Sequence, residues 1–395
     1  MTASSPRRLP GGRVPIVTWA TDLDHVALEQ ATNVSNLAIA LDHVALMPDA
    51  HAGYGMPIGG VLFADAAVVP FAIGVDIGCG VALAETDLTI ETLATSELED
   101  VLEAIDLGVP TGFQRLPAAV DRDVAEAALE MPRPASVAAA WFEQSLAQLG
   151  TLGGGNHFLE IQRDETGAIA VMLHSGSRHL GKTICDEFHR RALEHDRAAG
   201  LEIPHRELAY LPRGTSDFDG YWAAMTFALR YAEVNRSRML DVVERAFAAH
   251  TKIGRFERTV DIHHNYAAWE HHAGMDGLVH RKGAVRARVG ETVLIPGSMG
   301  SASYVGVGLG DPDAFESCQH GAGRAMSRKA ARRAKSSRQV FDEMAALGVV
   351  LRSSEPRGVA EEAAFAYKDV DAVMTASGSL VRPVRRLTPL GVVKG

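Results

Sequence analysis

The stretch VALMPDAHAGYGMPIGGVLFADAAVVPFAIGVDIGCGVALAET, residues 44 to 86, alternates short apolar runs with glycine-rich turns. Runs of β-branched and apolar residues bounded by Gly and Pro are typical of short strands joined by tight turns. Within it, GVDIGCG at 74–80 places Asp76 and Cys79 three residues apart among glycines. The stretch therefore predicts sheet structure around a glycine-rich loop that carries a carboxylate and a thiol.

Outside this stretch, helices and strands are expected to interleave. The residue pattern predicts a mostly helical region at 89–150, a strand at 167–175, helices at 182–199 and 218–249, short strands at 258–310, and another helix at 322–336. The mixture shows no regular βαβ alternation, so it favours an α+β fold. Because the elements interleave rather than segregate, we expect one domain over residues 1–395.

Composition excludes several classes of protein. The chain has 395 residues, 47% of them hydrophobic, and no window approaches the roughly 20 apolar residues of a membrane span. The N-terminal region lacks the apolar segment of a signal peptide. Three cysteines are too few and too scattered for a disulfide framework. We therefore expect a cytoplasmic protein that does not bind membranes.

The net charge of −10 argues against general coating of nucleic acid, but one segment is locally basic. RAMSRKAARRAKSSR at 324–338 contains seven Lys and Arg residues and no acid. Such a run is either a solvated helix face or a local site for a polyanion. By itself, the sequence leaves both interpretations open.

Five side chains scattered along the chain are candidate metal ligands: Asp76, Cys79, His157, His174 and His264. Carboxylate, thiolate and imidazole bind Zn²⁺, Mn²⁺ or Fe²⁺, and a thiolate can bridge two ions. Each residue alone has a structural alternative as a buried core group. His263 and His264 are adjacent, so in a strand they point to opposite faces and at most one is a ligand.

GSRHLGKT at 176–183 satisfies the pattern of a phosphate-binding P-loop and lies between an expected strand and an expected helix. The bulky His179 and Leu180 stand where such a loop wraps closely around phosphates. No downstream apolar strand ending in a magnesium-binding aspartate is evident. A P-loop NTPase is therefore a weaker alternative.

Ten motifs, taken together and in order, resemble the RtcB family of GTP- and manganese-dependent RNA ligases. They are MPDAHAGYGMPIGG (47–60), GVDIGCG (74–80), GTLGGGNHFLEI (150–161), MLHSGSR (172–178), HHNYA (263–267), HRKGAV (280–285), IPGSMGSASYV (295–305), HGAGRAMSR (320–328), AYKDVDAV (366–373) and GVVKG (391–395). The resemblance runs from about residue 14 to the end, with the spacing of the shorter bacterial form. It implies a single large domain of mixed and antiparallel sheets with surrounding helices.

The resemblance also implies a cofactor set of two Mn²⁺ ions and GTP. Asp76, Cys79 and His157 would hold the first ion, and Cys79 would bridge to a second ion held by His174 and His264. His320 would attack the α-phosphate of GTP and carry GMP as a phosphoramidate. Arg324, placed one helical turn beyond His320, and Arg178 would hold phosphate oxygens, and Lys282 would add charge near the site.

The nucleotide contacts implied by the resemblance form a larger set, in which Glu160 would recognise guanine. They are Asn156, His157, Phe158, Leu159, Glu160, His264, Asn265, Pro296, Gly297, Ser298, Met299, Ser303, His320, Gly321, Ala322, Gly323 and Lys394. Asp49 and His51 fall in the first motif and are expected to line the site, without an assigned role. A role for His280 is left open.

The implied substrates are RNA ends that carry a 3′-phosphate or a 2′,3′-cyclic phosphate, joined to 5′-hydroxyl ends. We expect a monomer, and the resemblance leaves open an archease-like activating partner. Two further alternatives remain from the residues alone. One is a dinuclear-metal phosphodiesterase that acts on RNA ends without nucleotide, and the other is a metal-stabilised protein that binds RNA without chemistry.

Overall fold

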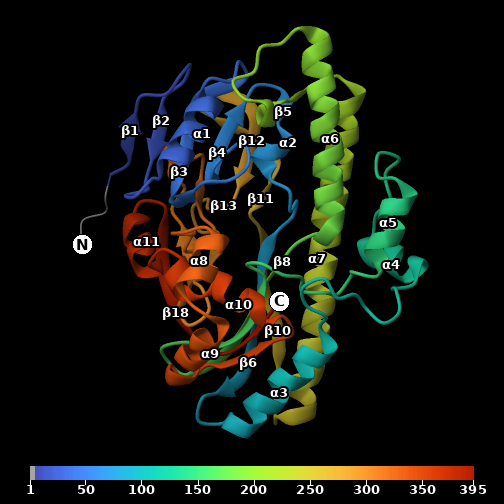
Figure 1. Cartoon of the computed structure of the whole chain (residues 1–395), viewed down its shortest axis with the longest axis vertical. Coiled ribbons are helices and arrows are strands. Elements are labelled where there is room, and N and C mark those ends of the chain that lie inside the picture. The colour runs from blue at the N-terminus through green and yellow to red at the C-terminus, as the bar shows by residue number, and fades with distance from the viewer. Residues whose placement is uncertain (1–4) are drawn as a thin grey trace.

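The structure, a computed structural model, describes residues 5–395 and contains two large sheets flanked by helices (Figure 1). The first sheet has six strands in the order β1 (Arg7–Leu9), β2 (Ile16–Thr18), β3 (Ala40–His51), β4 (Ile58–Ala64), β12 (Met275–Lys282) and β11 (Asn265–His272). The β2–β3 pair is parallel and the other neighbours are antiparallel. Three apolar runs of the 44–86 stretch thus lie in strands, namely β3, β4 and β6 (Gly80–Thr89), as expected. The run at 66–73 differs, because it forms only the two-residue strand β5 (Ala67–Val68) and the short helix α2 (Pro70–Ile73).

The second sheet has eight strands and curls toward a closed barrel. Its order is β10 (Phe256–His263), β6 (Gly80–Thr89), β8 (Ala168–Ser175), β7 (Phe158–Arg163), β18 (Val381–Lys394), β15 (Ser303–Gly308) and β14 (Thr292–Ile295), with β17 (Val350–Ser353) paired to β18. All pairs along this path are antiparallel, and β14 at one end also contacts β10 at the other. Two short ladders pair β5 (Ala67–Val68) with β9 (Leu211–Pro212) and β13 (Ala284–Arg286) with β16 (Ser317–Gln319).

The α-helices are α1 (His25–Ser35), α2 (Pro70–Ile73), α3 (Thr95–Gly108), α4 (Arg122–Leu129), α5 (Ala139–Leu146), α6 (Arg178–Ala199), α7 (Ser216–His250), α8 (Arg328–Ala334), α9 (Ser337–Ala346), α10 (Pro356–Val359) and α11 (Val370–Ala376). The long helix expected at 218–249 is α7, and it packs along α6 on one flank of the molecule (Figure 1). The mixture of helices with mixed and antiparallel sheets confirms the expected α+β class.

Helix α7 also carries polar groups that hold the site loops. The buried guanidinium of Arg236 pairs with Asp261 and donates hydrogen bonds to the carbonyl oxygens of Gly78 (3.0 Å) and Ser175 (2.9 Å). Asn235, also buried, accepts a hydrogen bond from the backbone of Gly150 at 2.7 Å. Buried polar groups are stable only when they are paired, so these contacts fix the loops before β6 and after β8 relative to the helix.

The prediction of a helix at 322–336 is wrong for residues 322–327, and the helix that does form ends at Ala334. Residues 322–327 form an irregular loop, and α8 begins only at Arg328, after the side chain of Ser327 caps the helix by accepting from the backbone N–H of Ala330. Gly323 has φ +74°, a left-handed conformation that interrupts a helix. A second cap at Ser336 starts α9. Arg324 is therefore not one helical turn beyond His320.

Candidate active site

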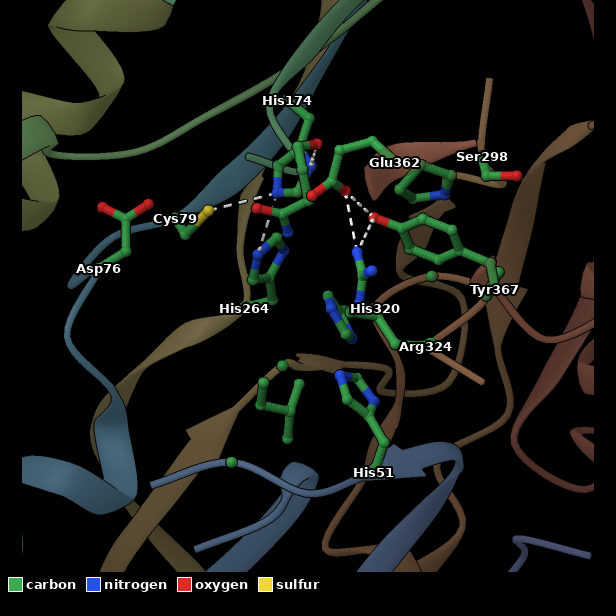
Figure 2. A pocket seen from close by; sticks show the side chains of 18 of the residues that line it. His51, Asp76, Cys79, His174, His264, Ser298, His320, Arg324, Glu362 and Tyr367 are labelled. Carbon is green, nitrogen blue, oxygen red and sulfur yellow. Dashed lines mark hydrogen bonds and ion pairs between the residues drawn. The ribbon is translucent and has the colours of Figure 1, made fainter. Parts of the chain in front are cut away.

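A cavity of about 810 Å³ lies between the two sheets and collects most of the predicted site residues. The first sheet contributes His51 at the end of β3, and the second sheet contributes His174 from β8 and Lys394 from β18. Figure 2 shows His174 and His264 directed toward Cys79, with His320 facing the same cavity. Segments from the whole length of the chain thus meet at one place.

Cys79 lies at the centre of the candidate metal ligands. Its Sγ is 3.4 Å from Nε2 of His157 and 3.2 Å from Nε2 of His174, and the latter nitrogen is 3.4 Å from Nε2 of His264. Nε2 of His157 lies 3.0 Å from Oδ2 of Asp76. Two groups of three potential donors result, Asp76 with Cys79 and His157, and Cys79 with His174 and His264. They share the sulfur, which is the arrangement that two neighbouring cations would need.

The histidines of this cluster are oriented by backbone carbonyls. Nδ1 of His157 donates to the carbonyl oxygen of Leu152 (2.9 Å), and Nδ1 of His174 donates to that of Asn156 (3.1 Å). This pairing leaves the Nε2 lone pairs directed at the cluster, as metal-binding imidazoles require. Burial lowers the pKa of both histidines and of His264, so they are held in the neutral form that binds metals.

The donor chemistry fits a divalent cation. Burial raises the pKa of the Cys79 thiol well above its ordinary value, and the neighbouring carboxylate of Asp76 adds to this shift. A bound cation reverses that effect, because coordination deprotonates a thiol. Oδ1 of Asp76 and Nδ1 of His264 are also buried without a hydrogen-bond partner among residues 5–395. Mixed carboxylate, imidazole and thiolate donors suit Mn²⁺, Fe²⁺ or Zn²⁺.

His320 stands on the neighbouring wall with a different partner. Its Nδ1 lies 2.7 Å from Oδ2 of Asp49, whose side chain is fully buried, and its backbone N–H donates to the same oxygen at 3.2 Å. The ring centroid is 4.8 Å from that of His264. The carboxylate lies beside Nδ1 without a hydrogen bond to it among residues 5–395, and the ring is close to the candidate metal ligands.

Most of the residues predicted to contact the nucleotide line the cavity: Asn156, Phe158, Glu160, His264, Asn265, Pro296, Gly297, Ser298, Met299, His320, Gly321, Ala322, Gly323 and Lys394. Three predicted residues lie elsewhere. His157 belongs to the metal-donor cluster, Leu159 packs in the apolar core, and Ser303 is buried behind the cavity wall. Ser303 accepts a hydrogen bond from Gln162, whose amide donates to Glu160 at 2.7 Å, so it supports the carboxylate indirectly.

Three cationic side chains predicted for the site have different environments. Lys282 lines the cavity and donates to the carbonyl oxygens of Tyr54 and Met56, and burial lowers its pKa to about 7. Lys394 donates to the carbonyl oxygen of His157 at 3.0 Å, and burial lowers its pKa to about 8. Arg178 lies outside the cavity lining, with Nη1 3.0 Å from Nδ1 of His157.

Sequence reasoning missed Glu362, a buried carboxylate on the cavity wall. It pairs with Arg324 (3.1 Å) and Arg328 (3.0 Å) and accepts a hydrogen bond from the hydroxyl of Tyr367, as Figure 2 shows for the first and last of these. Burial alone would raise the pKa of Glu362, but the charges of Lys394 and the two arginines outweigh it and hold the pKa below its ordinary value. Tyr367 lay in a recognised motif, whereas nothing in the sequence marked Glu362.

The basic run at 324–338 is largely neutralised by acids of α9 and by Glu361 and Glu362. Arg332 pairs with Glu361, Lys335 with Glu343 and Arg338 with Asp342, in addition to the pairs of Glu362. Five of the seven basic residues of this run form ion pairs. The other two, Lys329 and Arg333, have no ion pair within 4.0 Å among residues 5–395. An uninterrupted basic helix face is therefore absent from the described part of the chain.

The P-loop pattern at 176–183 does not form a phosphate-binding loop. Residues 178–199 are helical, so Gly181, Lys182 and Thr183 lie inside α6, and Lys182 pairs with Asp186 one turn later. Lys182 does not line the cavity. His280 is also structural, because its Nε2 accepts the backbone N–H of Val69 in the core.

Comparison with known proteins agrees with this site. A family model described as "tRNA-splicing ligase RtcB" matches residues 30–395. The RNA-splicing ligase RtcB of Escherichia coli (strain K12) is 39% identical over 407 residues, covering 96% of this chain and 97% of the relative. That of Mycobacterium tuberculosis is 36% identical over 440 residues, covering 93% and 100%, and the tRNA-splicing ligase RtcB of Pyrobaculum aerophilum is 35% identical over 465 residues, covering 98% and 96%.

No helix within residues 5–395 is both long enough and apolar enough to cross a membrane. The family match spans the second sheet, most of the first sheet and every cavity-lining segment from residue 30 onward, together with all five candidate metal ligands and His320. Relatives from bacteria and an archaeon align over nearly the whole chain at 35–39% identity. The chain belongs to the RtcB family of RNA-splicing ligases.

Proposed function

We propose that this protein is a GTP- and Mn²⁺-dependent RNA ligase that joins RNA 3′-phosphate or 2′,3′-cyclic phosphate ends to 5′-hydroxyl ends. The observation that carries the proposal is the pairing of His320 with Asp49 in a cavity that also contains two sulfur-sharing donor groups. A nucleophilic imidazole beside a metal-binding cluster is suited to nucleotidyl transfer. The family membership supplies RNA as the substrate class.

The proposed chemistry has three transfers. Nε2 of His320 attacks the α-phosphorus of GTP, so that an N–P bond forms and pyrophosphate leaves. An oxygen of the RNA 3′-phosphate then takes GMP and frees the imidazole. Finally the 5′-hydroxyl attacks the activated 3′-phosphorus, GMP leaves, and the hydroxyl proton passes to solvent. A cyclic phosphate end is first opened by water to the 3′-phosphate.

Each of the site residues would have its own role in these transfers. Asp49 orients His320 and stabilises the positive charge that develops on its ring. Glu160 accepts the N1–H and exocyclic amine of guanine, and Lys394 and Arg324 face phosphate oxygens. Asp76, Cys79, His157, His174 and His264 would hold two Mn²⁺ ions. When bound, these ions supply neutralisation of phosphate charge.

Incubation of the protein with Mn²⁺ and GTP labelled at the α-phosphate, followed by denaturing electrophoresis, tests the proposal. We expect acid-labile, alkali-stable label on the chain. His320→Ala abolishes labelling, and Lys182→Ala retains it, since Lys182 pairs with Asp186 and does not line the cavity. Label that survives in His320→Ala contradicts the assignment of the nucleophile.

The same assay separates the ligase from a dinuclear-metal phosphodiesterase. A phosphodiesterase opens cyclic phosphate ends with Mn²⁺ alone and forms no covalent nucleotide. A ligase opens them and also converts a 3′-phosphate RNA and a 5′-hydroxyl RNA to one product only when GTP is present. Opening without labelling and without joining would favour the phosphodiesterase.

A further inference from the structure

Phe113, in the loop between α3 and α4, is the most exposed of the large apolar side chains in the part of the chain that the structure describes. Its side chain is 92% exposed. Single exposed apolar residues are common on protein surfaces and need no function. The position of this one is unusual because the backbone just before it is hydrogen-bonded to the loop that leads into the candidate active site.

The backbone before Phe113 is hydrogen-bonded to the chain at the start of the glycine loop 153–155. The backbone N–H of Leu152 donates to the carbonyl oxygen of Pro110, and that of Gly112 donates to Gly153, both at 2.9 Å. Gly112 has φ +59°, and a Cβ there would collide with the carboxylate of Glu355. The chain therefore turns at Gly112 under close constraint, which fixes the backbone next to Phe113 while its ring stays in solvent.

The same glycine loop is flanked by two guanidinium groups. That of Arg178 packs against Gly153, and Nη2 of Arg328 would lie 2.8 Å from a Cβ at Gly155. Arg328 lines the cavity, and Nε of Arg178 is buried without a hydrogen-bond partner among residues 5–395. Two cations thus lie against a short stretch that is also hydrogen-bonded to Gly112, the residue before Phe113.

The loop also leads directly into the site. Asn156, which follows Gly155, lines the cavity, and His157 belongs to the metal-donor cluster. Phe113 itself is outside the cavity lining, so it is not placed to contact the nucleotide bound within. A ligand that reaches both the cavity and the ring has to extend beyond the cavity lining.

We infer that Phe113 is a stacking platform for a nucleobase of the RNA strand whose end occupies the cavity. The inference rests on the proposed ligase function. Single-stranded RNA is bound by stacking of its bases on aromatic side chains, while its phosphates contact Arg and Lys. Arg328 pairs with Glu362, whereas Arg178 has no acidic partner within 4.0 Å among residues 5–395. A cation without an acidic partner beside the loop favours a polyanion over an apolar segment of a protein partner as the occupant.

Steady-state ligation of single-stranded RNA carrying a 3′-phosphate, with GTP and Mn²⁺ in excess, tests the inference. Base–aromatic stacking contributes about 1–3 kcal/mol, so Phe113→Ala is expected to raise KM for RNA about tenfold with little change in kcat. Phe113→Trp keeps a stacking surface and is expected to retain the wild-type KM. Leu107→Ala, at another position that is 81% exposed, is the matched control and is expected to leave KM unchanged.

Labelling by α-labelled GTP alone needs no RNA, and it is recorded for every variant to detect a folding defect. An unchanged KM in Phe113→Ala, or a raised KM in Phe113→Trp, overturns the inference. If substitution of Phe113 changes KM only when a protein partner is present, the ring contacts that partner and the inference is overturned. Absence of labelling in the wild-type protein would instead count against the proposed function. In that event, binding of fluorescent 3′-phosphate RNA to the same variants still decides whether Phe113 stacks.

Discussion

At the scale of single residues, the group at Nδ1 distinguishes the histidines of the site. A backbone carbonyl accepts from Nδ1 of His157 and of His174 and fixes the tautomer without a negative charge, and at His157 the guanidinium of Arg178 also lies 3.0 Å away. His320 faces the carboxylate of Asp49 instead, with Nδ1 2.7 Å from Oδ2. The first arrangement suits a metal ligand and the second suits a nucleophile that becomes cationic when it carries a phosphoryl group.

Asp49→Asn is therefore expected to slow formation of the covalent nucleotide by roughly 100-fold, a typical contribution of a group that assists a nucleophile through charge and orientation. The amide keeps the size of the side chain but not its charge. Single-turnover labelling with α-labelled GTP measures the rate, and a thermal melt checks the fold. Labelling at the wild-type rate would show that the carboxylate does not act on His320.

Glu160 gives a prediction about pH and base specificity. Burial raises its pKa to about 7 from an ordinary value of 4.5. Below that pH the protonated carboxyl cannot accept both donors of guanine, so labelling by GTP is expected to increase as the pH rises through about 7. Ionisation of Glu160 also lowers the free energy of unfolding as the pH rises from about 4.5 to about 7, because the pKa of Glu160 in the folded state lies above its unfolded value.

Glu160→Gln is expected to lose this pH limb and at least about tenfold of the preference for GTP over ATP, since one good bidentate contact is worth about 1–3 kcal/mol of discrimination. Competition between the two labelled nucleotides measures the preference. A variant that still selects GTP as the wild type does would assign guanine recognition to another group.

At the scale of elements, the glycine loop 153–155 joins the apolar chain after α5 to the first residues of β7. Gly153 has φ +83°, and a Cβ there would collide with the guanidinium of Arg178, which itself contacts His157. A side chain at this position would displace Arg178 and disturb the metal-donor cluster. The loop has to consist of glycines because Arg178, Gly112 and Arg328 approach it closely.

Gly153→Ala and Gly290→Ala form a matched pair that tests this requirement. Gly290 has a similar φ of +85°, and no heavy atom lies within 4 Å of the place that a Cβ would occupy there. Both variants are expected to lose about 1–2 kcal/mol of stability from the left-handed backbone. Only Gly153→Ala is expected to lose covalent labelling by GTP as well, by about tenfold or more. Equal activity in the two variants would mean that Arg178 moves aside at no functional cost.

At the scale of the whole molecule, the cavity exists because the two sheets meet. The first sheet supplies Asp49 and His51, and the barrel-like second sheet supplies His174 and Lys394. The other metal donors lie in segments that adjoin strands of the second sheet. The donors of the cluster come from segments as far apart as residues 76 and 264. A cation bound there joins these segments and stabilises only the folded chain.

Mn²⁺ is therefore expected to raise the melting temperature of metal-free protein by a few degrees, as about 2.7 kcal/mol is gained at a hundredfold excess over Kd. A chelator reverses the shift. Cys79→Ala is expected to abolish it, while Cys185→Ala, which removes another buried free thiol, retains it. An Mn²⁺ shift that persists in Cys79→Ala would show that the thiol is only a packing group.

The amino-acid sequence alone specified the chemical inventory and the local structure. Apolar runs broken by glycine indicated the strands of the 44–86 stretch, and the 3.6-residue period indicated α7, because backbone preference and burial pattern act over a few neighbouring residues. Ordered motifs over most of the chain were enough to suggest the family. The sequence also supplied the residue types that later proved to meet in the cavity.

Which of these residues converge depended on the three-dimensional fold. The pairing of Val81 with His174 and of Gly80 with His263 brings β6, β8 and β10 into register, and this register places Cys79, His174 and His264 together. Long-range pairing likewise gave Arg324 and Arg328 their partner Glu362 and gave Arg332 its partner Glu361. These outcomes depend on contacts between segments that are distant in the chain, and no local propensity encodes them.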